Sequence, residues 1–128
     1  MLPTAFEDAI AQFNQGEFYA CHDTLEALWF EALEPEKTFY QGILQVAVAC
    51  YHLENENRRG AVMLLGEGVR RLRDYQPDYG GIDVAQLMGD GLNLLHHLQQ
   101  SSDRMDAGLA PLPQIIPSDS PPDGELES

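Results

Sequence analysis

Four polar side chains stand at helical spacing in two otherwise apolar stretches, and their types could support metal binding or proton transfer. His22 and Glu26 lie four residues apart in "ACHDTLEALW", and Gln45 and His52 lie seven apart in "QGILQVAVACYH". Residues four or seven apart share one face of an α-helix. Because both stretches are mainly apolar, we expect the polar stripes to face the protein interior, where polar groups need partners.

The two stripes belong to consecutive helices that a short turn near residue 35 should fold into an antiparallel hairpin. In that register Glu26 lies opposite Gln45, and Trp29 lies opposite Gln41 or Gly42. The polar side chains of both helices then converge in one small volume. The sequence therefore predicts one polar cluster, or ligand-binding site, with these members: His22, Glu26, Trp29, Gln41, Gln45 and His52.

One interpretation of this cluster is purely structural. Glu26 would accept hydrogen bonds from an imidazole and from an amide, and the network would fix the register of the two helices. Buried polar networks of this kind are tolerated when every member is satisfied, and they can specify a unique packing. Burial of the cluster therefore does not by itself require chemistry.

The other interpretation is functional. Two histidines and one carboxylate resemble the ligand set of a non-haem iron or zinc site, and His22, Glu26 and His52 would supply the ligands for a divalent metal. A small-molecule pocket is the third possibility, with or without acid–base chemistry by Glu26 and a histidine. No residue is assigned a catalytic role.

The elements that must position these side chains are all helical. Apolar residues recur with the helical period from the N-terminus to about residue 104, and no alternating strand pattern occurs. "QPDYGG" predicts a loop before the last helix, and Gly16, Asn57 and Asp83 predict helix ends. We expect a single antiparallel bundle of five helices at these positions: 3–13, 17–33, 36–53, 58–75 and 83–100.

Composition divides the chain into a domain and a tail. Residues 1–104 form the predicted bundle, whereas residues 105–128 hold five of the eight prolines, five acids and no base. We expect this acidic tail to be disordered. Its stretch "LAPLPQIIP" is apolar enough to lie against the domain, so disorder is expected above all after Ser118.

The net charge of the chain limits the classes of partner that it can bind. A net charge of −14 argues against nucleic acid and against anionic membrane surfaces, since both require a basic face. The segment "MLPTAFEDAIAQF" carries acid and no base, which does not fit a targeting peptide, and no window is long and apolar enough to span a membrane. We expect a cytoplasmic protein in which Cys21 and Cys50 are buried, reduced thiols, and a disulfide between them is the alternative.

The two polar stripes also carry a family resemblance. "FNQGEFYACHDTLEALW" followed by "FYQGILQVAVACYHLENENRRGA" resembles the family called domain of unknown function 309. The resemblance implies an all-helical bundle of about five helices, with the His/Glu/Gln cluster as its polar core. It implies no activity.

Together these observations predict a small helical protein that is a non-enzymatic binding or interaction module. A protein partner, a second copy of the chain or a small molecule would be bound through the cluster or the adjoining surface. The alternative is a metal-dependent or acid–base enzyme that uses His22, Glu26 and His52.

Overall fold

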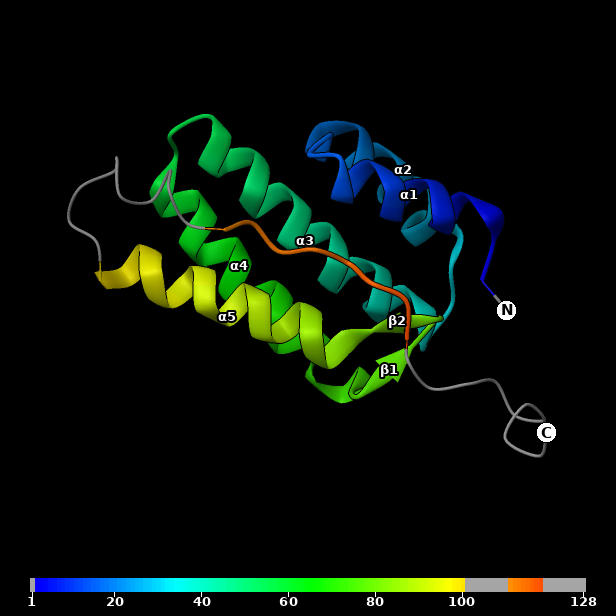
Figure 1. Cartoon of the computed structure of the whole chain (residues 1–128). Coiled ribbons are helices and arrows are strands. Elements are labelled where there is room, and N and C mark those ends of the chain that lie inside the picture. The colour runs from blue at the N-terminus through cyan, green and yellow to red at the C-terminus, as the bar shows by residue number, and fades with distance from the viewer. Residues whose placement is uncertain (1, 101–110, 119–128) are drawn as a thin grey trace.

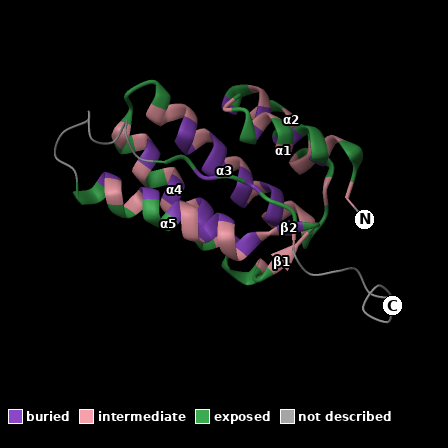
Figure 2. Ribbon diagram, viewed as in Figure 1, coloured by how far each residue is buried: buried purple, intermediate pink, exposed green. Residues whose placement is uncertain are grey.

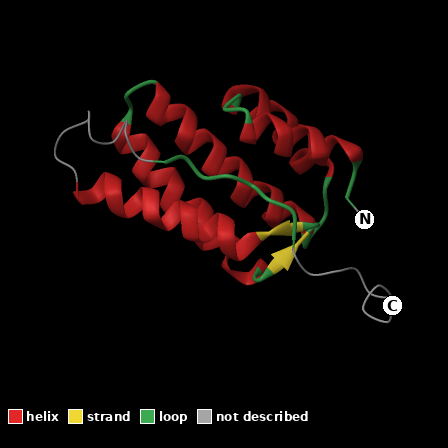
Figure 3. Cartoon of the chain, in the orientation of Figure 1, coloured by secondary structure: helices red, strands yellow, loops and turns green. Residues whose placement is uncertain are grey.

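The protein is a bundle of helices with a small hairpin at one end (Figures 1 and 3). The computed structural model describes residues 2–100 and 111–118, and within these it contains five α-helices, as the sequence predicted. The elements follow in this order: α1 (Thr4–Asn14), α2 (Phe18–Glu31), α3 (Glu36–Glu54), α4 (Arg58–Leu72), the 3₁₀ turn η1 (Arg73–Tyr75), β1 (Asp78–Tyr79), β2 (Ile82–Asp83) and α5 (Val84–Gln100).

Three predicted helix ends are formed by the expected residues. Gly16 ends α1 with a φ of +82°, a conformation that glycine adopts without steric cost. The Asn57 side chain accepts a hydrogen bond from the Gly60 N–H at 2.9 Å, and so caps α4. The Asp83 carboxylate does the same for the Gln86 N–H at the start of α5, also at 2.9 Å. Local sequence therefore determines where these helices begin and end.

The central helix is α3, which packs against α2 on one side and α4 on the other. Buried residues recur along its whole length (Figure 2), and it holds more of them than any other helix, so it forms the middle of the core. Its contact with α4 is close because Gly42 faces Leu72 and Gly68. The closest neighbours of a Cβ at Gly68 would be the Gly42 carbonyl oxygen and Val46. Two glycines thus allow the two helix backbones to approach one another.

The predicted loop before α5 is a β-hairpin. Asp78 pairs with Asp83, and Tyr79 with Ile82. The connection consists of Gly80 and Gly81, both with positive φ, which is the geometry of tight two-residue hairpin turns. The glycines were correctly taken as a turn, but the strands are only two residues long, which is too short for a period-2 pattern to appear in the sequence.

Residues 111–118 pack against the bundle as an extended segment, as the apolar stretch "LAPLPQIIP" suggested. Ile115 is buried, and Asn14 of α1 both donates to its carbonyl oxygen and accepts from its N–H, each at 2.8 Å. Ile116 and Ser118 bond to the backbone of the hairpin, so the segment covers the edge of β2. The core therefore extends beyond the predicted boundary at residue 104. The rest of the predicted tail, residues 105–110 and 119–128, lies outside the described residues.

None of the helices among the described residues combines the length and the apolar character needed to cross a membrane.

Candidate functional site

The face that α2 turns toward the core is not the one predicted. Phe18, Cys21 and Leu25 are its buried residues, and they form the stripe next to the polar one. Leu33, the last member of the predicted inner stripe, follows the end of the helix and is 82% exposed. The reason is that α2 packs against both α1 and α3, and the most apolar stripe occupies the space between them.

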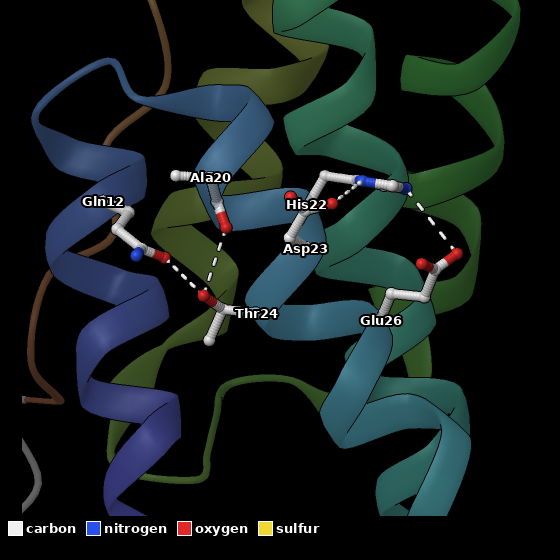
Figure 4. A network of polar contacts seen from close by, with 6 residues as sticks. All are labelled: Gln12, Ala20, His22, Asp23, Thr24 and Glu26. Atoms are coloured by element: carbon white, nitrogen blue, oxygen red, sulfur yellow. Dashed lines mark hydrogen bonds and ion pairs between the residues drawn. The ribbon is translucent and has the colours of Figure 1, made fainter.

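His22 and Glu26 therefore lie at the surface of α2. The side chain of His22 is 27% exposed and that of Glu26 is 61% exposed. His22 Nε2 lies 3.8 Å from Glu26 Oε2, and Nδ1 lies 3.2 Å from Asp23 Oδ1 (Figure 4). The ring of Tyr19 lies beside the imidazole, with 5.9 Å between the ring centroids. The predicted pair exists, but it is not a buried bridge.

Thr24 shows how α2 is fixed against α1 on the opposite side from this pair. Its hydroxyl donates to Gln12 Oε1 at 2.8 Å, and it lies 3.1 Å from the Ala20 carbonyl oxygen of the preceding turn (Figure 4). The contact holds the helix in one rotation about its axis. His22 and Glu26 are thereby kept facing away from α1.

Gln45 is buried as predicted, but its partners come from α4. Its amide nitrogen donates to Glu67 Oε1 at 3.0 Å, and its carbonyl oxygen accepts from Arg71 Nη1 at 3.2 Å. The same Arg71 nitrogen lies 3.8 Å from Glu67 Oε1. Both ends of the amide are satisfied, so Gln45, Glu67 and Arg71 form the polar bridge between α3 and α4 that had been expected between α2 and α3.

His52 does not join the predicted cluster. It lies near the end of α3, where Nδ1 is 3.4 Å from the Asn57 side-chain nitrogen. Among the described residues, the group whose potential ligand atoms lie within 4.8 Å of one another is His22, Asp23 and Glu26. The predicted convergence of His22, Glu26, Gln45 and His52 is therefore wrong: α2 is rotated outward, and the partners of Gln45 and His52 lie on α4 and in the turn before it.

Four of the six predicted residues nevertheless share a pocket. Glu26 and Trp29 of α2 face Gln41 and Gln45 of α3 across a cavity of about 290 Å³, in the antiparallel register that the sequence predicted. Its remaining walls are apolar and come from α3 and α4: Leu44, Val48 and Leu64. The pocket thus combines an apolar body with one carboxylate and two amides, the composition of small-ligand sites.

Trp29 is held in this pocket by Lys37. The Lys37 ammonium lies 4.1 Å from the centroid of the indole ring and donates to the Trp29 carbonyl oxygen at 2.8 Å. The indole Nε1 is buried and has no hydrogen-bond partner in the part of the chain that the structure describes. A buried donor without a partner costs about 1–3 kcal/mol.

A larger cavity lies away from the predicted residues. It has a volume of about 860 Å³ and lies between α1, the hairpin and residues 111–118. Within it the Tyr79 hydroxyl donates to Glu36 Oε2 at 2.7 Å. Sequence reasoning missed Glu36, Tyr79, Lys37 and Glu67, because each is a single polar residue whose role depends on long-range packing. For Arg71, its position on the same face as Glu67 was an available signal.

The two thiols are buried, as predicted. Cys21 and Cys50 are both free, and burial raises the pKa of each thiol to about 12. At neutral pH they are therefore protonated and poor nucleophiles. They contribute to the core rather than to any reaction.

Comparison with known proteins supports the family resemblance. Residues 6–64 match a family model described as Domain of unknown function (DUF309). The chain is also 33% identical over 75 residues to the Uncharacterized protein YpuF of Bacillus subtilis (strain 168). That match covers 57% of this chain and 43% of the relative, so the chain spans less than half the length of this relative. The matched family range contains all six predicted site residues.

Proposed function

We propose that this chain, which matches a family of unknown function over residues 6–64, is a non-enzymatic binding module that holds a small ligand in the Trp29 pocket. The observation that carries the proposal is the shared pocket of Glu26, Trp29, Gln41 and Gln45, whose other walls are apolar. The ligand would lie against Trp29 and Leu64 and would bond to the carboxylate and the amides. The net charge of −14 argues against a nucleic acid or an anionic membrane surface as the partner.

The module is proposed as non-enzymatic because its polar groups fit binding better than proton transfer. The amide of Gln45 is fully engaged with Glu67 and Arg71, and so acts as a fixed wall. Glu26 is exposed and has His22 as its only recorded ion-pair partner among the described residues. General acid–base catalysis requires a donor and an acceptor placed at the reacting atom inside a water-excluding site. The exposed His22–Glu26 pair lacks that enclosure.

The test uses Trp29 itself, which is the only tryptophan in the chain. A fragment library is screened by two-dimensional NMR of the full chain, in which the single indole N–H signal reports on the pocket. We expect hits to shift that signal and to lose at least about tenfold in affinity in Glu26→Gln, while Glu17→Gln, outside the pocket, binds normally. The proposal would be contradicted by hits that do not shift the indole signal, or by hits that bind Glu26→Gln with unchanged affinity.

A metal site is the second candidate, and one observation favours it. His22, Asp23 and Glu26 can each offer one ligand atom within 4.8 Å of the others, a set of one imidazole and two carboxylates that suits zinc or iron. When bound, the ion would supply Lewis-acid chemistry. Elemental analysis of protein purified without chelators, compared with His22→Ala, tests this candidate. Stoichiometric metal that is lost in the variant would support it, and metal-free protein would exclude it.

A further inference from the structure

Two cavities border the N-terminal residues Leu2 and Pro3. The cavity of about 860 Å³ lies on one side of them, and a second of about 620 Å³ lies on the other, between α1 and α2. Leu2, Pro3 and Glu36 line both. Both cavities therefore border the first turn of α3, and each is in the size range of small-ligand sites.

The walls of the larger cavity are mainly aliphatic. Phe6 and Ile10 come from α1, Ile82 from the hairpin, and Ile115 and Ile116 from the segment 111–118. Ile82 and Ile115 are almost completely buried and belong to the core, so the cavity borders the core. A ligand that fills such a space gains free energy in proportion to the apolar area that it removes from water.

The charged groups around both cavities have one sign. Glu7 and Glu36 line the larger cavity, and Glu31 and Glu36 line the smaller one. No lysine, arginine or histidine is among the described residues that line either cavity. A carboxylate ligand would therefore be repelled, whereas a cation would gain a partner.

Glu36 is positioned to be that partner. The Tyr79 hydroxyl donates to Oε2, which orients the carboxylate and leaves Oε1 to accept another hydrogen bond. Burial, followed by the hydrogen bond to Glu36, raises the pKa of Tyr79 to about 12, so the phenol remains a donor at neutral pH. The rings of Phe39 and Tyr75 pack against Tyr79 at 4.8 and 4.9 Å and hold it in place.

We infer that this cavity binds a linear aliphatic amine, with the alkyl chain between α1 and residues 111–118 and the ammonium group on Glu36. An ammonium group has three donors, and Glu36 Oε1 and the lone pair of the Tyr79 oxygen are acceptors suited to it. The inference concerns a cavity that shares no lining residue with the Trp29 pocket, and neither site depends on the other.

The experiment compares ligands that share one chain length and differ in the head group. n-Octylamine, n-octanol and n-octanoate are titrated into the full chain at pH 7 by isothermal calorimetry. We expect saturable one-site binding of octylamine, with octanol and octanoate at least about tenfold weaker. In methyl NMR spectra, the signals of Ile10 and Ile115 should shift with the same midpoint as the calorimetric titration.

Two matched variants separate the head-group contact from general effects of charge. Glu36→Gln should weaken octylamine binding at least about tenfold, whereas Glu54→Gln, at the other end of α3, removes the same charge and should leave it unchanged. Circular dichroism verifies that both variants fold, and Glu7→Gln replaces Glu36→Gln if that variant does not. Equal binding of octylamine and octanoate, equal loss in the two variants, or shifts confined to methyls outside the cavity would overturn the inference.

Discussion

Replacing Gly68 with alanine should loosen the contact between α3 and α4, and the geometry gives the size of the effect. A Cβ at this position would lie 2.8 Å from the Gly42 carbonyl oxygen and 2.9 Å from Val46 Cγ2. Ordinary contacts of a Cβ begin at 3.4 Å, so the helices would have to separate by roughly half an ångström. The Gly42 oxygen belongs to the backbone and cannot rotate away, which makes the clash more costly than one with a flexible side chain.

The expected change in the free energy of unfolding is the difference between a packing cost and a gain in helix propensity. Overpacking a core costs about 1–3 kcal/mol, and a backbone contact places Gly68→Ala at the upper end. Alanine is favoured over glycine in a helix by about 1 kcal/mol, which offsets part of this cost. We expect a net loss of about 2 kcal/mol in the free energy of unfolding, and a melting temperature lower by about 8 °C.

Gly66→Ala is the matched control, because the same substitution is made two residues away on the same helix. The nearest atom to its Cβ would be Leu95 Cδ2 at 4.0 Å, so nothing has to move. This variant should gain about 0.5–1 kcal/mol from helix propensity alone. Urea denaturation followed by circular dichroism measures both variants. If they unfold at the same urea concentration, the close approach of α3 and α4 is not as described.

Other buried groups lead to three further expectations. Ile115→Ala should lose about 2–4 kcal/mol in urea denaturation, whereas Ile116→Ala, at an exposed position, should lose less than about 1; equal losses would mean that residues 111–118 are not seated as described. The raised pKa of Tyr79 means that the folded state holds the phenolic proton more tightly, so this stabilisation is complete below pH 10 and is lost as the pH rises to about 12. Tyr79→Phe should therefore flatten the alkaline decline of the melting temperature in that window, and an unchanged slope would argue against the Tyr79–Glu36 bond. Cys21 and Cys50 should react with a disulfide reagent only after denaturation, and rapid labelling of native protein would contradict their burial.

The helices were predictable because local signals determine them. Gly16, Asn57 and Asp83 act through their own backbone conformation or through an N–H three residues away, and neither depends on distant packing. The antiparallel register of α2 and α3 followed from the short turn between them. The structure therefore confirms both the predicted helix ends and the predicted register.

The rotation of α2 was not predictable in the same way. Two neighbouring stripes of this helix are candidates for the core, one with Trp29 and one with Phe18, Cys21 and Leu25. The second is more uniformly apolar and is the buried one, while Trp29 stands at its edge. The choice depends on α1, which packs on the side that the sequence reasoning left unconsidered.

The hydrogen-bond partners of Gln45 could not be predicted from the sequence either. Its burial could be inferred from the apolar residues around it, but its partners could not, because α3 is in contact with helices on both sides. Glu67 and Arg71 stand on one face of α4, and only the close approach at Gly42 and Gly68 brings that face within reach of the amide. The partners of a residue on a central helix follow from three-dimensional packing.

The two hydrogen bonds between the Asn14 side chain and the Ile115 backbone also affect the order in which the protein folds during synthesis. It joins residues 101 positions apart, so it cannot form until the ribosome has produced the segment around Ile115. The helical bundle can assemble earlier, but Ile82 and the edge of β2 then remain uncovered. A nascent chain, or one that ends early, would expose this unpaired strand edge. Protection by a chaperone would therefore matter most during synthesis of the stretch from residue 100 to residue 118.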